Sequence, residues 1–152
     1  MKIGDCMKRK VFTSRPGITI QKAAEMMVQH HIGTLPIVND SMHLIGLVTL
    51  HDLITPAIPD FYQLVEDLDF VHDFGAAEDE KPACEYLQSP IEKILKEPVY
   101  VEETAGLTRA ITMLQEHDLN DLPVVDENMR LVGIASRVDI GVALLSNLIL
   151  PS

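Results

Sequence analysis

LPIV at Leu35–Val38, followed by LIGLVTLHD at Leu44–Asp52, is a pattern that this chain contains twice. It returns as LPVV at Leu122–Val125 and as LVGIASRVD at Leu131–Asp139. The whole segment Ile18–Leu53 recurs without a gap at an offset of 87 residues. Many positions that are not identical exchange one aliphatic residue for another, which preserves a shared core. Such self-similarity indicates a tandem duplication.

Each copy predicts the same order of elements. Apolar residues from Ile20 to Val28 recur at helical spacing, and 35–38 and 44–48 are typical of short strands joined by a turn at 39–41. The second copy predicts a helix over 107–117, strands over 122–125 and 131–135, and a turn at 126–128. A leading extended segment, at Phe12–Thr13 in the first copy and at 99–101 in the second, and a closing helix complete each unit.

The fold class is therefore α+β, with two β-α-β-β-α repeats. Each unit is too small to bury its sheet alone, so we expect the two to pack as one pseudo-twofold module. We expect repeat 1 at 1–55, an acidic linker at 56–89 and repeat 2 at 90–152. Within the linker, apolar residues at helical spacing predict an amphipathic helix over Asp60–Phe74, followed by an acidic connection over 76–82.

Composition excludes several classes of function. The chain has 152 residues, with 12 Lys and Arg against 23 Asp and Glu, so its net charge is −11. This charge disfavours nucleic-acid and membrane-surface partners. The apolar stretches are shorter than the roughly 20 residues of a membrane helix, so we expect no membrane insertion. Two cysteines and no secretory signal indicate a cytoplasmic protein.

One local pattern points to chemistry. A hydroxyl residue is followed three positions later by aspartate at the start of each closing helix, as Thr49 and Asp52 and again as Ser136 and Asp139. This spacing resembles a helix capping box, which needs no ligand. The same corner can instead hold a nucleotide, because a helix N-terminus receives phosphate and a carboxylate accepts ribose hydroxyls. Spacing alone favours the cap.

A family resemblance changes that weighting. The segments 30–38 with 44–52, and 117–126 with 131–139, resemble in order, spacing and duplication the paired cystathionine-β-synthase (CBS) domains, or Bateman modules. The resemblance covers nearly the whole chain outside the linker. It implies two domains in pseudo-twofold contact, whose clefts in many members bind adenosine-containing ligands and regulate a partner.

The resemblance also implies roles for individual residues. Asp52 and Asp139 resemble the ribose-binding aspartates, and Thr49 and Ser136 the hydroxyls beside the phosphate. Walls of the adenine pocket correspond to Thr13, Ile32, Thr34, Leu35, Pro36, Val101, Leu119, Asp121, Leu122 and Pro123. Two departures stand out: Asp121 occupies a position where a small residue is common, and His51 stands where Arg137 supplies a cation in the second copy. We therefore expect the second corner to suit phosphate better and the first to suit the base.

The leading hypothesis is a regulatory module that senses an AMP, ADP or ATP class ligand, with an S-adenosylmethionine-type compound as the alternative ligand. The rival hypothesis is a ligand-free interaction or assembly module. No catalytic machinery, metal-ligand spacing or obligatory cofactor is visible, so we do not expect an enzyme. We expect a homodimer and an effector protein whose identity the sequence does not give.

Overall fold

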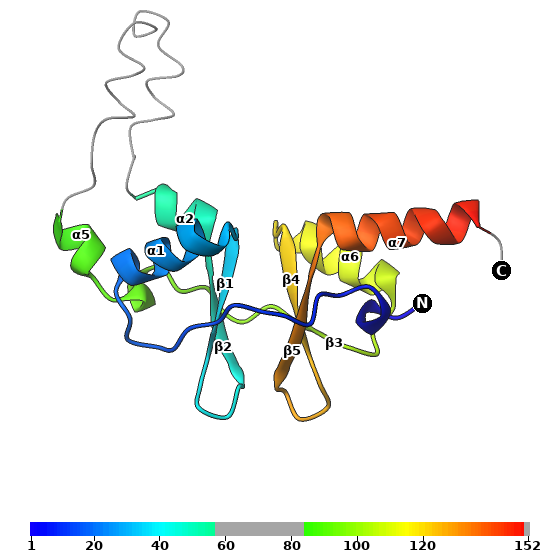
Figure 1. Cartoon of the computed structure of the whole chain (residues 1–152), viewed down its shortest axis with the longest axis horizontal. Coiled ribbons are helices and arrows are strands. Elements are labelled where there is room, and N and C mark those ends of the chain that lie inside the picture. Colours follow the sequence, from blue (N-terminus) through cyan, green and yellow to red (C-terminus); the bar gives the residue numbers. More distant parts are fainter. Residues whose placement is uncertain (57–83, 151–152) are drawn as a thin grey trace, which may run out of the picture.

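The computed structural model describes residues 1–56 and 84–150. Its elements follow one another as η1 (Ile3–Asp5), α1 (Ile20–His30), β1 (Thr34–Val38), β2 (Leu44–Thr49), α2 (Leu50–Ile54), α5 (Cys84–Gln88), η3 (Ile91–Lys93), β3 (Val101–Glu102), α6 (Leu107–Glu116), β4 (Asp121–Val125), β5 (Leu131–Ser136) and α7 (Arg137–Ile149). The mixed α+β class and the two repeats are confirmed. Figure 1 shows the repeats side by side, with their hairpins pointing the same way and their helices above.

The two hairpins repeat each other in detail. Antiparallel β1 and β2 pair Pro36 with Leu47, and β4 and β5 pair Pro123 with Ile134. Both pairs shift register at the same place, after Ile37 in the first and after Val124 in the second. Positive φ angles recur at the 87-residue offset too, at His31 and Asp118 and at Met42 and Met129. The duplication therefore extends to backbone irregularities as well as to the apolar pattern.

The leading strands of the two repeats differ. In repeat 2, β3 lies parallel to β4 and completes a three-stranded sheet. In repeat 1 the strand expected at Phe12–Thr13 is an isolated parallel bridge between Ser14 and Ile37. The pairing ends there because Pro16 has no N–H to donate and Gly17 turns the chain with a φ of 87°.

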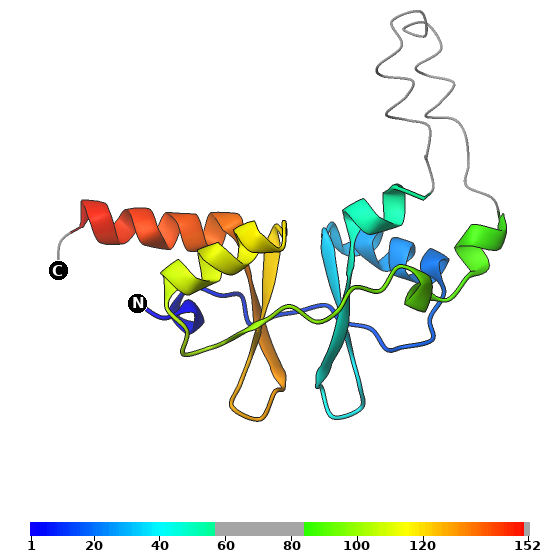
Figure 2. The ribbon, with the colours of Figure 1, turned by 180° about the vertical axis from the view of Figure 1, so that it is seen from behind.

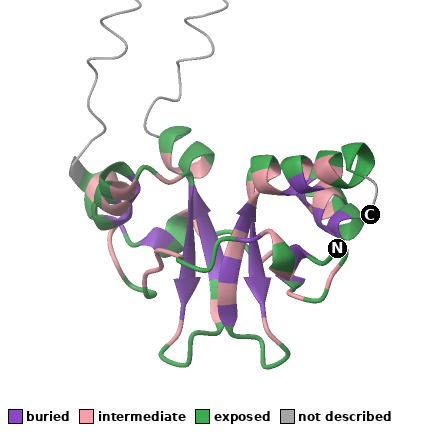
Figure 3. Cartoon of the chain, turned by 45° about the vertical axis from the view of Figure 1, so that its right-hand side comes forward, coloured by how far each residue is buried: buried purple, intermediate pink, exposed green. Residues whose placement is uncertain are grey.

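Each repeat buries a stripe of its first helix. Thr19 caps α1 by accepting a hydrogen bond from the Lys22 amide at 3.1 Å, and Ile20, Ala23 and Met27 of α1 are buried against β1 and β2. In repeat 2 the corresponding buried residues of α6 are Leu107, Ala110 and Leu114. Figure 3 shows the result, with buried strands inside and exposed helix surfaces outside.

Some residues pack in the core of the repeat to which they do not belong in sequence. Ile3 and Met7 belong to the core of repeat 2, whereas Ile91 belongs to the core of repeat 1. The Lys8 amide donates to the Ile134 carbonyl, and the Lys96 amide donates to the Leu47 carbonyl, both at 2.9 Å. The N-terminal segment around Lys8 crosses one face of the two sheets in Figure 1, and the segment around Lys96 that leads into β3 crosses the opposite face in Figure 2. We call these two the crossing segments. Each repeat is therefore completed by a segment of the other repeat.

Gly46 and Gly133 allow these crossings. A Cβ atom at Gly46 would lie 2.6 Å from the Lys96 carbonyl oxygen, and one at Gly133 would lie 2.9 Å from the Lys8 carbonyl oxygen. Both obstacles are backbone atoms that cannot rotate away. The two glycines of the duplicated strand pattern are thus required by the crossing segments.

The linker is described in part. The expected amphipathic helix over Asp60–Phe74 and the acidic connection over 76–82 lie outside the described residues. At its C-terminal end, α5 packs beside α1. There the Tyr86 hydroxyl donates to the Leu53 carbonyl at 2.6 Å, and the Gln88 side-chain amide donates to Gln21 at 2.9 Å. This end of the linker is therefore attached to repeat 1.

Candidate functional site

Both hydroxyl-x-x-Asp corners form helix caps. Thr49 accepts the Asp52 amide at 3.2 Å and donates its own hydroxyl to that carboxylate at 2.8 Å. Ser136 accepts the Asp139 amide at 3.0 Å, and its own amide donates to the Asp139 carboxylate at 3.0 Å, which completes a capping box. Capping fixes the orientation of each carboxylate at the start of α2 or α7.

Each carboxylate also faces a lysine that the sequence analysis did not single out. Lys96 Nζ lies 3.3 Å from Asp52 Oδ2, and Lys8 Nζ lies 3.8 Å from Asp139 Oδ2. Both lysines come from the crossing segments, so each pair joins the two repeats. A signal was available in the sequence, because Lys8 and Lys96 correspond at an offset of 88, one residue away from the offset of the main repeat.

A pocket of about 540 Å³ opens beside the Lys96–Asp52 pair, and we call it the Lys96 pocket. Both repeats and the crossing segment contribute to it. Its walls are Leu47, Lys96, Glu97, Pro98, Val99, Tyr100, Arg109, Met113, His117 and Leu119. The pocket therefore combines an aromatic ring and aliphatic side chains with three basic side chains. Asp52 is not one of its walls and adjoins it through the ion pair with Lys96.

A second pocket, of about 230 Å³, lies beside the Lys8–Asp139 pair, and we call it the Lys8 pocket. Its walls are Lys8, Lys10, Val11, Phe12, His31, Ile32, Gly33, Thr34, Asp121 and Ile134. Several of these residues occupy the positions in the duplication that correspond to walls of the Lys96 pocket. The two pockets are therefore pseudosymmetric counterparts of unequal size.

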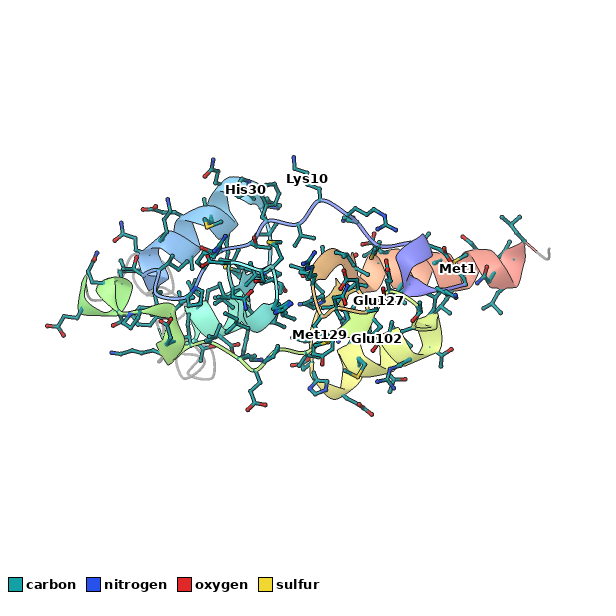
Figure 4. The ribbon with its side chains drawn as sticks, turned by 90° about the horizontal axis from the view of Figure 1, so that it is seen from below. Met1, Lys10, His30, Glu102, Glu127 and Met129 are labelled. Atoms are coloured by element: carbon teal, nitrogen blue, oxygen red, sulfur yellow. The ribbon has the colours of Figure 1, made fainter. Side chains whose placement is uncertain are left out.

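Two contacts restrict the Lys8 pocket. The Phe12 ring stacks on His30 at a centroid distance of 3.7 Å, and Lys10 Nζ lies 5.3 Å from the Phe12 centroid. Figure 4 shows His30 and Lys10 on the same side of the molecule. Thr34 donates its hydroxyl to Asp121 Oδ2 at 3.0 Å, which joins equivalent positions of the two repeats. In the Lys96 pocket, by contrast, His117, the counterpart of His30 at the 87-residue offset, lines the pocket together with Tyr100.

Comparison with known protein families identifies this architecture. The sequence model of the CBS domain matches residues 3–56 and 91–146. The chain belongs to the CBS domain family. The two matched segments correspond to the two repeats, so the structure is a CBS domain pair.

Sequence and structure comparisons found similar proteins. An uncharacterized protein of Methanopyrus kandleri is 27% identical over 140 residues, which cover 92% of this chain and 61% of that relative. A CBS domain pair in complex with 5′-methylthioadenosine and S-adenosyl-L-methionine superposes with a TM-score of 0.68 at 22% identity, covering 97% of this chain and 98% of that one. CBSX2 in complex with AMP gives a TM-score of 0.66 at 23% identity, covering 95% and 96%. At these identities the two structures establish the fold.

The CBS pair brings only part of the expected site together. Ile32, Thr34, Leu119 and Asp121 line the two pockets. The other expected residues lie elsewhere: Leu35, Val101 and Leu122 are buried in the repeat cores, Pro36 and Pro123 are buried in strands, Thr13 is half-buried and His51 is exposed. The pocket walls that the sequence analysis missed come mainly from the crossing segments.

Arg137 is engaged by the protein itself. Its Nε donates to the Leu119 carbonyl at 2.8 Å, and its Nη2 donates to the Leu114 carbonyl at 3.2 Å. The guanidinium thus binds carbonyl groups in the last turn of α6 and in the connection between α6 and β4. Arg137, which the resemblance placed beside phosphate, is thus held by the protein's own carbonyl groups in this structure, and the larger of the two pockets lies on the Asp52 side.

Asp121 titrates abnormally within the CBS pair. Burial raises the pKa of its carboxyl group, and the Asp139 charge raises it further, while the Thr34 hydrogen bond and Lys8 act in the opposite direction. The pKa of Asp121 is therefore higher in the folded protein than in the unfolded chain. At pH values above the folded-state pKa, the ionised carboxylate lowers the stability of the folded protein. That cost disappears as the pH falls through the folded pKa toward the unfolded pKa.

Asp121→Asn is therefore expected to stabilise the protein modestly at neutral pH. Asparagine keeps an acceptor for the Thr34 hydroxyl and removes the half-buried charge. We expect a melting temperature about 1–3 °C higher at about pH 7, with a gain that shrinks by about pH 4.5. Thermal unfolding at both pH values measures it. A variant less stable than wild type at neutral pH would mean that the carboxylate's attraction to Lys8 outweighs its burial.

Within residues 1–56 and 84–150, no helix has the length and apolar character needed to cross a bilayer. The same residues contain no group of three His, Cys, Asp or Glu side chains placed to share one metal ion.

Proposed function

We propose that this CBS pair is a regulatory module that binds an adenine nucleotide in the Lys96 pocket. The adenine would lie among Tyr100, Met113 and Leu119, and its ribose hydroxyls would be bound by Asp52. Because the pocket walls come from both repeats, a bound ligand favours one relative orientation of the repeats over others. That orientation would pass the occupancy to a second copy or to an effector protein.

One observation carries this proposal: an open pocket between the repeats lies beside a carboxylate whose orientation is fixed by a helix cap. The ligands of the structural neighbours support it, since one neighbour binds AMP and another binds 5′-methylthioadenosine and S-adenosyl-L-methionine. All three compounds contain adenosine, the part that the pocket and Asp52 would hold.

The rival function is a ligand-free assembly module. It is favoured by the capping hydrogen bonds of Thr49 and Ser136, which account for both corners without a ligand. A thermal-shift panel of AMP, ADP, ATP, 5′-methylthioadenosine and S-adenosyl-L-methionine separates the two functions. At a ligand concentration of about 100 Kd, binding to the folded state adds about 2.7 kcal/mol of stability. Unchanged melting with every compound at millimolar concentration would support assembly.

We also propose a homodimer in which α7 of each copy packs on α1 and α2 of the other. Val138, Val142, Leu145 and Ile149 recur at helical spacing along α7 and are exposed. An apolar groove between α1 and α2, lined by Met27, Val28, Leu50, Leu53 and Ile54 among others, offers a complementary surface. Figure 1 shows α1, α2 and α7 along the same edge of the molecule, as a reciprocal twofold contact requires.

Leu145→Glu is expected to convert the dimer into a monomer, because it places a charge in the centre of the α7 stripe. Asn147→Glu adds the same charge at an exposed position outside the stripe and should leave the dimer intact. Light scattering at tens of micromolar measures the mass of each variant. A wild-type monomer, or a Leu145→Glu dimer, would contradict this interface.

A further inference from the structure

Lys96 both forms an ion pair with Asp52 and lines the Lys96 pocket. Its ammonium group pairs with Asp52 at 3.3 Å, and its side chain also forms part of the pocket wall. The pair is partly exposed, with 42% of the lysine side chain and 22% of the aspartate side chain accessible. An ion pair of this exposure contributes little stability, so its exchange for other partners costs little.

The charge of the Lys96 pocket differs from that of the chain. Lys96 and Arg109 line it together with a single carboxylate, Glu97, although the chain as a whole carries −11. Arg109 forms no ion pair with any residue in the described part of the chain. The pocket thus offers two cations to a bound anion. An adenosyl sulfonium would instead bring its positive charge toward Lys96.

We propose that Lys96 is the residue that makes the pocket select phosphate-bearing adenosine ligands over uncharged or sulfonium adenosine compounds. On binding, Lys96 moves from Asp52 to the phosphate, and the released carboxylate accepts the ribose hydroxyls. After this exchange the Lys96 ammonium contacts the phosphate and the Asp52 carboxylate contacts the ribose hydroxyls. A single movement of Lys96 therefore prepares both contacts with the ligand. This inference rests on the proposed function. It specifies the charge of the preferred ligand and names Lys96 as the residue that selects that charge.

The Lys96 side chain can be replaced without removing the main-chain hydrogen bonds that hold this segment. Its structural role is the main-chain pairing with Leu47, which a new side chain leaves in place. Lys96→Met keeps the aliphatic length and removes the charge. Lys22→Met removes one charge from the exposed surface of α1 and serves as the charge-matched control. Lys8→Met removes the pseudosymmetric lysine and tests which pocket is used.

The experiment is calorimetric titration of all four proteins with AMP, adenosine and S-adenosyl-L-methionine. Wild type should bind AMP at least about tenfold more tightly than adenosine, as one charge-assisted hydrogen bond to an exposed lysine provides. In Lys96→Met this ratio should fall to about one to three, with adenosine affinity unchanged or improved, because Asp52 is no longer paired. Lys22→Met should retain the wild-type ratio, and Lys8→Met should change it less than Lys96→Met.

Two negative results are distinguishable. Adenosine binding with an unchanged AMP preference in Lys96→Met would overturn the role of Lys96 and leave the proposed function standing. Failure of wild type to bind any of the three compounds would overturn both. As a second measurement, the AMP preference of wild type should decrease between about 0.05 and about 0.5 M salt, because exposed charges are screened. A preference independent of salt would contradict selection by charge.

Discussion

Ile91→Ala is expected to unfold repeat 1 more readily, although Ile91 lies in the sequence of repeat 2. Its side chain is fully buried in a cluster with Ile20 and Leu35. Truncation of a buried isoleucine to alanine costs about 2–5 kcal/mol, because it removes buried surface and leaves a cavity. For a chain of this size that corresponds to a melting temperature lower by about 4–20 °C.

Thermal or urea unfolding measures this loss, and hydrogen exchange locates it. Amides of α1 should lose more protection than amides of α6, because Ile91 packs against α1. Gln29→Ala, at an exposed position of α1 outside the groove of the proposed dimer, should change stability by less than about 0.5 kcal/mol. If Ile91→Ala melted like Gln29→Ala, the assignment of Ile91 to the core of repeat 1 would be wrong.

The second large effect concerns the two aspartates. Asp52→Ala should weaken AMP binding by about 10- to 100-fold, because a carboxylate that accepts ribose hydroxyls contributes about 1.5–3 kcal/mol per charged hydrogen bond. Asp139→Ala should cost less than about threefold, since Asp139 lies beside the smaller Lys8 pocket, which Asp121 also lines. Calorimetric titration of both variants measures the difference.

Melting temperatures control for the loss of each helix cap. Both variants lose a carboxylate at the start of a helix, so similar melting temperatures with unequal affinities would separate binding from folding. Equal affinities in wild type and both variants would reduce the two corners to helix caps. A larger loss from Asp139→Ala would restore the order expected from sequence.

The duplication made most of the fold predictable. The apolar pattern of 35–38 and 44–48 located the first hairpin to within a residue at each end, and the offset of 87 carried that assignment to the second. Periodicity identified α1 and α6 because their buried faces pack against the strands. It did not predict the single-bridge pairing at Ser14, which depends on where the chain turns at Gly17.

The candidate site was less predictable because it depends on segments that cross between repeats. The sequence placed Asp52 and Asp139 at helix starts, since that follows from local spacing. It missed Lys8 and Lys96, which reach their aspartates only through long-range pairing with β5 and β2. The resemblance placed Arg137 beside phosphate, and in the structure that side chain donates hydrogen bonds to the carbonyl groups of Leu114 and Leu119.

The most direct measurement is a crystal structure of the protein grown with saturating AMP. Our account predicts adenine density between Tyr100 and Leu119 in the Lys96 pocket, ribose hydroxyls on Asp52, and the Lys96 ammonium moved from Asp52 to the phosphate. Density for AMP only in the Lys8 pocket, or an empty Lys96 pocket with the Lys96–Asp52 pair intact, would contradict it.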